Sequence, residues 1–133
     1  MTGYVIDASV AFEYLLRTPL GRTVANTIER ASLVAPELMD AEVLSVLRKA
    51  VFQGRVEEER ARMVVEDLIR WPVARIRHRE LARWAWYYRR NVTSYDALYV
   101  ACARLYGIPL LTADSRLARA SGLGVVMHDV RMA

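Results

Sequence analysis

Four acidic residues lie at positions where their carboxylates could bind a divalent cation. Asp7 directly follows one short apolar run, and Asp114 lies just after another. A carboxylate at the end of a strand that looks buried is costly unless something pairs with it. Two further acids, Glu42 and Asp96, lie near the start of segments with helical periodicity. If the four converge, they need a partner of opposite charge.

The partner that this set of residues favours is magnesium or manganese. Carboxylates within a few ångströms of one another repel strongly, so either some stay protonated or a cation neutralises them. Ligation by oxygen alone, without His or Cys, favours Mg²⁺ or Mn²⁺ over zinc. Mg²⁺ held by carboxylates keeps positions for water and phosphate oxygens, which suits hydrolysis of a phosphodiester. The sequence therefore predicts a phosphodiesterase site.

Asp96 also has a purely structural explanation. It falls in the first turn of a helix that Thr93 or Ser94 can cap, where the helix dipole favours an acid whatever its function. The apolar stripe that this helix is expected to bury consists of Ala97, Val100, Ala101 and Leu105.

Glu42 is one of three acids near the start of a helix expected at residues 38–54. It lies on the half of that helix that carries Leu38 and Val46, which we expect to face the core. An acid there indicates a place where the core ends. Glu37 and Asp40 are competing candidates, but both fall in the opening turn, where acids serve the helix dipole.

The elements that must position these acids alternate between short strands and longer helices. Apolar runs predict strands at residues 4–6, 33–35, 73–76, 109–112 and 125–127. Strands that alternate with helices form βαβ units, which give a mostly parallel sheet with helices on both faces. In such α/β folds ligands bind beyond the carboxyl ends of the strands, where the strand order reverses.

The composition indicates one cytoplasmic domain. The chain has 133 residues, 54% hydrophobic and 26% charged, so we expect a single domain over residues 1–133. No apolar stretch approaches the ~20 residues of a membrane span, and no signal peptide is recognisable, which predicts a cytoplasmic protein without membrane attachment. The single cysteine, Cys102, is expected in the core.

The basic residues are almost all arginine. Nineteen Lys and Arg against fifteen Asp and Glu give a net charge of +4, and only Lys49 is a lysine. Guanidinium groups bind phosphate oxygens in pairs, which favours a polyanionic partner, although a codon preference would give the same composition. Residues 75–91 interleave Arg with Trp and Tyr, a combination that can hold single-stranded RNA. The candidate RNA contacts in this run are Arg79, Arg83, Arg89 and Arg90.

This basic and aromatic run has a structural explanation as well. Leu81, Trp84 and Tyr88 recur at helical spacing, so the two aromatic side chains could face the core or a dimer partner. The arginines could equally cover a solvated face. His78 lies among them and is expected to be a surface residue rather than a general base.

Four motifs in the sequence resemble those of PIN domains, and specifically of VapC-type ribonuclease toxins. They are YVIDASV around Asp7, APELMDAEVLSVLRK around Glu42, SYDALYVACA around Asp96 and PLLTADSRLA around Asp114. The resemblance covers essentially the whole chain. It implies a three-layer α/β/α sandwich around a mostly parallel five-stranded sheet, with Mg²⁺-dependent endonucleolytic cleavage of RNA, Mn²⁺ being a possible substitute.

The resemblance also implies roles for individual residues. Asp7 and Asp96 would be the principal metal ligands, Asp114 would complete the ion site, and Glu42 would hold or orient metal-bound water. Ser9 and Thr112 match positions where the family often has hydroxyls; helix capping and turn formation are the structural alternatives for the two.

Two partners and one rival function belong to the same expectation. The family implies a homodimer and neutralisation by a cognate antitoxin of the VapB type. The rival is a noncatalytic PIN-like module that binds RNA or a partner protein, since intact ligand residues do not prove turnover.

Overall fold

The computed structural model describes residues 2–132, so Met1 and Ala133 of the expected domain lie outside the described residues. Strands and helices alternate along the chain, as the apolar runs predict. The strands are β1 (Gly3–Ile6), β2 (Ser32–Pro36), β3 (Val73–Ile76), β4 (Leu110–Thr112) and β5 (Met127–Asp129). The helices are α1 (Ala8–Leu16), α2 (Pro19–Glu29), α3 (Leu38–Phe52), α4 (Glu58–Arg70), α5 (His78–Tyr87), α6 (Ser94–Tyr106) and α7 (Ser115–Ala118), followed by a 3₁₀ turn at Val130–Met132.

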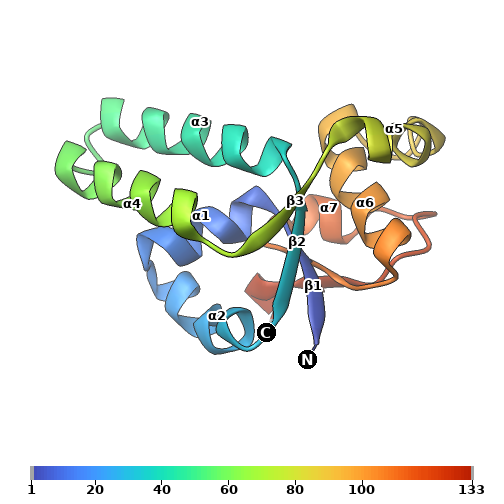
Figure 1. The fold of residues 1–133 in the computed structure, drawn as a ribbon, viewed down its shortest axis with the longest axis horizontal. Helices are drawn as coiled ribbons and strands as arrows, with labels where there is room; N and C mark the ends of the chain where they lie inside the picture. The colour runs from blue at the N-terminus through green and yellow to red at the C-terminus, as the bar shows by residue number, and fades with distance from the viewer. Residues whose placement is uncertain (1, 133) are drawn as a thin grey trace.

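The strands form one five-stranded parallel sheet in the order β3-β2-β1-β4-β5. Helices α1 to α4 lie on one side of this sheet and α5 to α7 on the other, as Figure 1 shows. Parallel strands need crossover connections, and here every crossover is helical. The predicted α/β/α sandwich with a parallel five-stranded sheet is confirmed.

The strand order reverses beside β1. From β1 the chain moves outward through β2 and β3, then returns to β4 on the other side of β1. Val5 pairs with Leu110 and Ile6 with Leu111, so the carboxyl ends of β1 and β4 lie next to each other. Asp7 follows β1 and Asp114 comes two residues after β4. This edge is the place where ligands bind in open α/β sheets.

The fifth strand differs from the prediction. It was expected at residues 125–127 but spans Met127–Asp129, whereas the other four strands agree with the prediction to within one residue at each end. Gly124 has a φ of 67°, which interrupts the extended run, and Val126 is 59% exposed. Pairing with β4 begins only where the Leu110 N–H donates to the Val126 carbonyl at 2.9 Å.

The buried faces of two helices also differ from expectation. Helix α3 buries Met39, Val43, Leu47 and Ala50; Leu38 packs against the core as expected, but Val46 is 40% exposed and does not face it. Helix α6 leaves Leu105 47% exposed. It packs on α5 as well as on β1 and β2, so its buried arc is wide and includes Tyr99 and Cys102. Cys102 is the core residue that the sequence predicted.

Helices α1 and α2 meet in a close junction. Arg17 ends α1 in the left-handed region, with a φ of 57°, and Thr18 caps α2 by accepting the Gly21 N–H at 3.1 Å. A Cβ at Gly21 would lie 2.0 Å from the carbonyl oxygen of Glu13, so only glycine fits against the end of α1.

None of the helices among residues 2–132 is both long and apolar enough to cross a bilayer.

Candidate active site

Asp7 lies between β1 and α1 and is only 7% exposed. Two hydroxyl groups bind its carboxylate: Ser9 Oγ and Thr112 Oγ1 both donate to Asp7 Oδ2, at 2.9 and 2.7 Å. No side chain among the described residues donates a hydrogen bond to the other oxygen, Asp7 Oδ1. Charge-assisted hydrogen bonds of this kind are what a buried carboxylate requires.

The same hydroxyls join the ends of β1 and β4. Ser9 Oγ accepts the Ala113 N–H at 2.9 Å, and Thr112 Oγ1 accepts the Asp114 N–H at 3.0 Å. Thr112 thus forms the turn bond that was its structural alternative, in addition to binding Asp7. Ser9 does not cap α1, because the capping position is Asp7 itself. Both hydroxyl residues belong to the acidic site.

Glu42 reaches the same place from α3. The hydroxyl of Tyr99, a side chain of α6 that is 1% exposed, donates to Glu42 Oε1 at 2.6 Å. Burial raises the pKa of Tyr99, and the bond to Glu42 raises it further, so the phenol stays protonated and acts as a permanent donor. Glu42 itself is half-buried.

Electrostatics connect three of the four acids. Burial raises the pKa of Asp7, the hydroxyls of Thr112 and Ser9 oppose that rise, and the charge of Asp96 adds to it. Burial also raises the pKa of Glu42; the bond from Tyr99 lowers it, and the charges of Asp7 and Asp96 raise it. Mutual repulsion of this kind is expected when carboxylates share one site.

A guanidinium group links Asp96 to Asp114. Arg116 Nη2 lies 3.3 Å from Asp96 Oδ2 and 3.3 Å from Asp114 Oδ2. The other oxygen of Asp114 caps α7 by accepting the N–H groups of Arg116 and Leu117, at 3.0 and 3.3 Å. Asp96 lies in the first turn of α6, which Thr93 caps as expected. The structure therefore brings Asp7, Glu42, Asp96 and Asp114 to one edge of the sheet.

The donor set fits a hard divalent cation in its chemistry. All four acids offer oxygen, and the repulsion that raises the pKa of Asp7 and Glu42 is what a cation relieves. Among residues 2–132, however, no group of three acidic, His or Cys side chains is arranged to hold an ion as it stands. Tyr99 binds only one oxygen of Glu42, which leaves Oε2 available, whereas Arg116 occupies Asp96 Oδ2. That the four are metal ligands stays a prediction.

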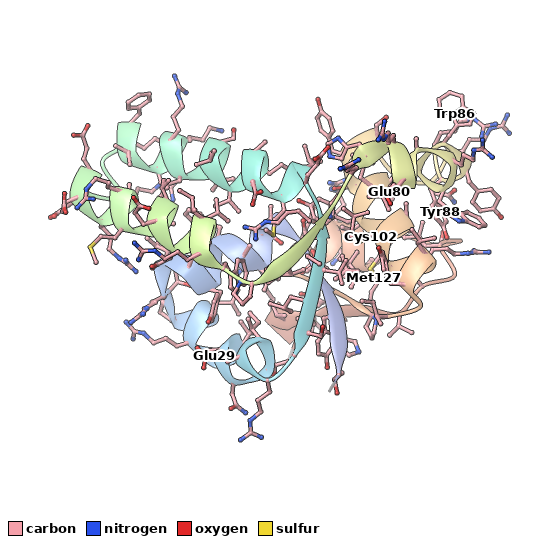
Figure 2. The ribbon with its side chains drawn as sticks, in the orientation of Figure 1. Glu29, Glu80, Trp86, Tyr88, Cys102 and Met127 are labelled. Carbon is pink, nitrogen blue, oxygen red and sulfur yellow. The ribbon has the colours of Figure 1, made fainter. Side chains whose placement is uncertain are left out.

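The candidate RNA-binding arginines are exposed and lie apart from these contacts. Arg79 and Arg83 project from α5, and Arg89 and Arg90 from the turn after it. The Arg89 guanidinium lies 4.9 Å from the centre of the Trp86 ring. Figure 2 shows Trp86 at the outer edge of the molecule, beyond α5. No contact among the described residues joins these arginines to the four acids.

Other members of the basic run have structural roles. Tyr88 is fully buried and donates its hydroxyl hydrogen to the Leu123 carbonyl, so its assignment to the core is confirmed. Trp84 is half-buried and packs against the core, with the Arg104 guanidinium 4.3 Å from its ring centre. His78 is also half-buried, with Nδ1 3.9 Å from Glu37 Oε1.

Two side chains of the site were missed in the sequence. Tyr99 lies three residues after Asp96, which puts the two on one face of α6, and Arg116 lies two residues after Asp114. Those spacings were the available signal. Asp40, a weaker candidate for catalysis, instead pairs with Arg75 at 3.1 Å.

Comparison with known proteins agrees with this architecture. The PIN domain family model matches residues 4–123. Ribonuclease VapC1 of Mycobacterium tuberculosis is 41% identical over 129 residues, which cover 96% of this chain and 97% of that protein. Ribonuclease VapC12 of the same species is 36% identical over 118 residues, covering 89% and 92%.

Two solved structures share the fold. The crystal structure of PAE2754 from Pyrobaculum aerophilum matches with a TM-score of 0.65 and 23% identity, covering 98% of this chain and 86% of the other. That of VapBC2 from Rickettsia felis, bound to a DNA fragment from their promoter, matches with a TM-score of 0.55 and 12% identity, covering 96% and 98%. With four acids at the switch point of a parallel sheet, and with relatives this similar over nearly its whole length, the chain belongs to the PIN domain family, among its VapC-type members.

Proposed function

We propose that this chain is an endoribonuclease that requires Mg²⁺ or Mn²⁺ and acts as the toxin of a VapBC-type pair. Two observations support the enzyme class: the relatives are named VapC ribonucleases, and the acidic residues typical of the family lie together here. The observation that carries the proposal is the convergence of Asp7, Glu42, Asp96 and Asp114 at one sheet edge. Carboxylates this close repel one another, which costs free energy unless a cation neutralises them.

Each residue of the acidic site has its own role in this proposal. Asp7, Asp96 and Asp114 would hold the cation, which supplies charge stabilisation at the scissile phosphate and lowers the pKa of a bound water. Ser9 and Thr112 orient the Asp7 carboxylate through Oδ2. Tyr99 occupies only one oxygen of Glu42, so Glu42 Oε2 is available to orient the attacking water and to accept its proton.

A second surface, on α5 and in the turn after it, suits RNA. Exposed arginines and aromatic side chains on α5 and in the turn after it can bind phosphates and stack on unpaired bases. Arg79, Arg83, Arg89 and Arg90 are the residues that we assign to this role. An antitoxin of the VapB type and a homodimer are the protein partners that we infer from the VapC relatives.

Cleavage of single-stranded RNA by the purified full chain tests the proposal. We expect cleavage with Mg²⁺ or Mn²⁺ and none in EDTA, and a loss of at least about 100-fold in rate for Asp7→Asn and Asp96→Asn. Asp67→Asn is the matched control, because Asp67 is exposed on α4, on the opposite side of the sheet from Asp96. An Asp7 or Asp96 variant with the wild-type rate in matched Mg²⁺ would show that the assignment is wrong.

The rival function predicts a different pattern. A noncatalytic RNA-binding module keeps its affinity for RNA in EDTA and cleaves nothing when Mg²⁺ or Mn²⁺ is restored. The same samples, measured for binding by fluorescence anisotropy and for cleavage on a gel, therefore separate the two functions.

A further inference from the structure

Arg116 is the only cationic side chain among the described residues that forms an ion pair with any of the four acids. It comes from α7, and its Nη2 atom lies 3.3 Å from one carboxylate oxygen of Asp96 and 3.3 Å from one of Asp114. Asp96 lies in the first turn of α6, and Asp114 is the N-cap residue of α7. One guanidinium thus neutralises charge at the point where the ends of α6 and α7 meet.

This contact conflicts with binding of a divalent ion. A metal that binds Asp96 through Oδ2 must replace Arg116 at that oxygen, and a guanidinium next to a bound cation would be repelled by it.

We propose that Arg116 is the built-in counter-ion of the acidic site, which a divalent cation must displace from Asp96 in order to bind. The inference rests on the proposed function only in taking a cation to be the natural ligand of this site. It assigns to Arg116 a role that the four acids alone do not reveal.

The surroundings of Arg116 suit an exchangeable group. Its side chain is 68% exposed, so it can turn into solvent without leaving a cavity or an unpaired buried charge. Its backbone N–H is fixed, since it donates to Asp114 Oδ1 at 3.0 Å. The guanidinium can therefore turn away while its backbone stays at the site.

Calorimetric titration of the full chain with Mn²⁺ alone, without RNA, tests the proposal. Arg116→Gln removes the charge and keeps most of the side-chain length. Arg119→Gln is the matched control, because Arg119 is exposed on the same short segment, loses the same charge, and pairs with no carboxylate among residues 2–132. We expect Arg116→Gln to bind Mn²⁺ roughly two- to tenfold more tightly than the wild type, the range expected for removing one or two exposed ion pairs. The control should remain within about twofold.

Each outcome decides the question. Mn²⁺ affinity of Arg116→Gln that is equal to or below that of the wild type overturns the proposal, as does the absence of Mn²⁺ binding in both proteins, or an equal gain in the Arg119→Gln control. RNA cleavage by the wild type is measured separately. If the wild type cleaves but Arg116→Gln binds Mn²⁺ no more tightly, the inference fails and the proposed function stands. If no RNA is cleaved but Arg116→Gln binds Mn²⁺ more tightly, the inference stands and the proposed function fails.

Discussion

Replacing Thr112 with valine removes the hydroxyl that joins the buried carboxylate of Asp7 to β4. Thr112 is fully buried, and valine fills nearly the same volume, so the change leaves no cavity. Two hydrogen bonds disappear: the one donated to Asp7 Oδ2 at 2.7 Å and the one accepted from the Asp114 N–H at 3.0 Å. Valine cannot replace either of them.

The expected loss follows from these two bonds. A hydrogen bond to a charged group contributes about 1.5–3 kcal/mol and a neutral one about 0.5–1.5 kcal/mol, so the free energy of unfolding should fall by about 2–4 kcal/mol. For a chain of 133 residues this lowers the melting temperature by roughly 10 °C. Because the Thr112 hydroxyl lowers the pKa of Asp7, its removal also raises that pKa, and the cost should be larger at pH 8 than at pH 4, since ionisation of Asp7 strengthens the lost bond.

Urea unfolding in EDTA measures the effect, at pH 8 and again at pH 4. Thr27→Val is the control, because Thr27 is exposed on α2 and its side chain makes no hydrogen bond among residues 2–132. In the Asp7→Asn background the acceptor is neutral, so Thr112→Val should cost about half as much. A loss below about 1 kcal/mol at pH 8, or an equal loss in both backgrounds, would refute the reasoning.

Four further outcomes are expected. Burial raises the pKa of Asp7 above its unfolded value, so the wild type loses stability as the pH rises through the folded pKa. Asp7→Asn avoids this loss and should unfold at a higher urea concentration than the wild type at pH 8 in EDTA. This advantage should vanish towards pH 4. Tyr99→Phe removes the bond that lowers the pKa of Glu42, so the acid limb of the pH–rate profile should move to higher pH and kcat should fall roughly 10- to 100-fold. Arg75→Ala removes a half-buried guanidinium that binds three backbone carbonyls and one carboxylate, so it should lower the free energy of unfolding by about 2–4 kcal/mol and leave RNA affinity unchanged. Arg89→Ala should flatten the dependence of RNA affinity on salt by a slope of about 0.7, the value for one lost phosphate contact, and an unchanged slope would assign Arg89 to a solvated face.

The sequence was sufficient for the sheet and for the approximate place of the acids. Short apolar runs between helical segments predict a parallel sheet, and in such a sheet residues that follow neighbouring strands must meet at one edge. That is why the sequence alone predicts that Asp7 and Asp114 lie close together. Strand β5 was misplaced because the apolar run at residues 125–127 follows the left-handed Gly124 and pairs with β4 only from its end, which hydrophobicity does not register.

The partners of the acids could not be predicted, because they depend on side-chain directions across elements. Tyr99 and Glu42 are separated by 57 positions, and their hydrogen bond follows from how α3 and α6 approach the sheet from its two sides. Arg116 could have turned to solvent as readily as to Asp96. Trp84 and Tyr88 share a helical spacing, yet Tyr88 lies beyond the end of α5 and enters the core, while Trp84 stays half-buried.

Strand β1 precedes the other four strands along the chain, yet it occupies the centre of the sheet. Its neighbour β4 comes from residues 110–112, so a growing polypeptide holds Asp7 without the Thr112 hydroxyl that binds it until 105 further residues have been added. Arg116 and Asp114 emerge later still. A chain that has been synthesised only as far as α6 therefore cannot assemble the site, and under the proposed function it could not yet cleave RNA.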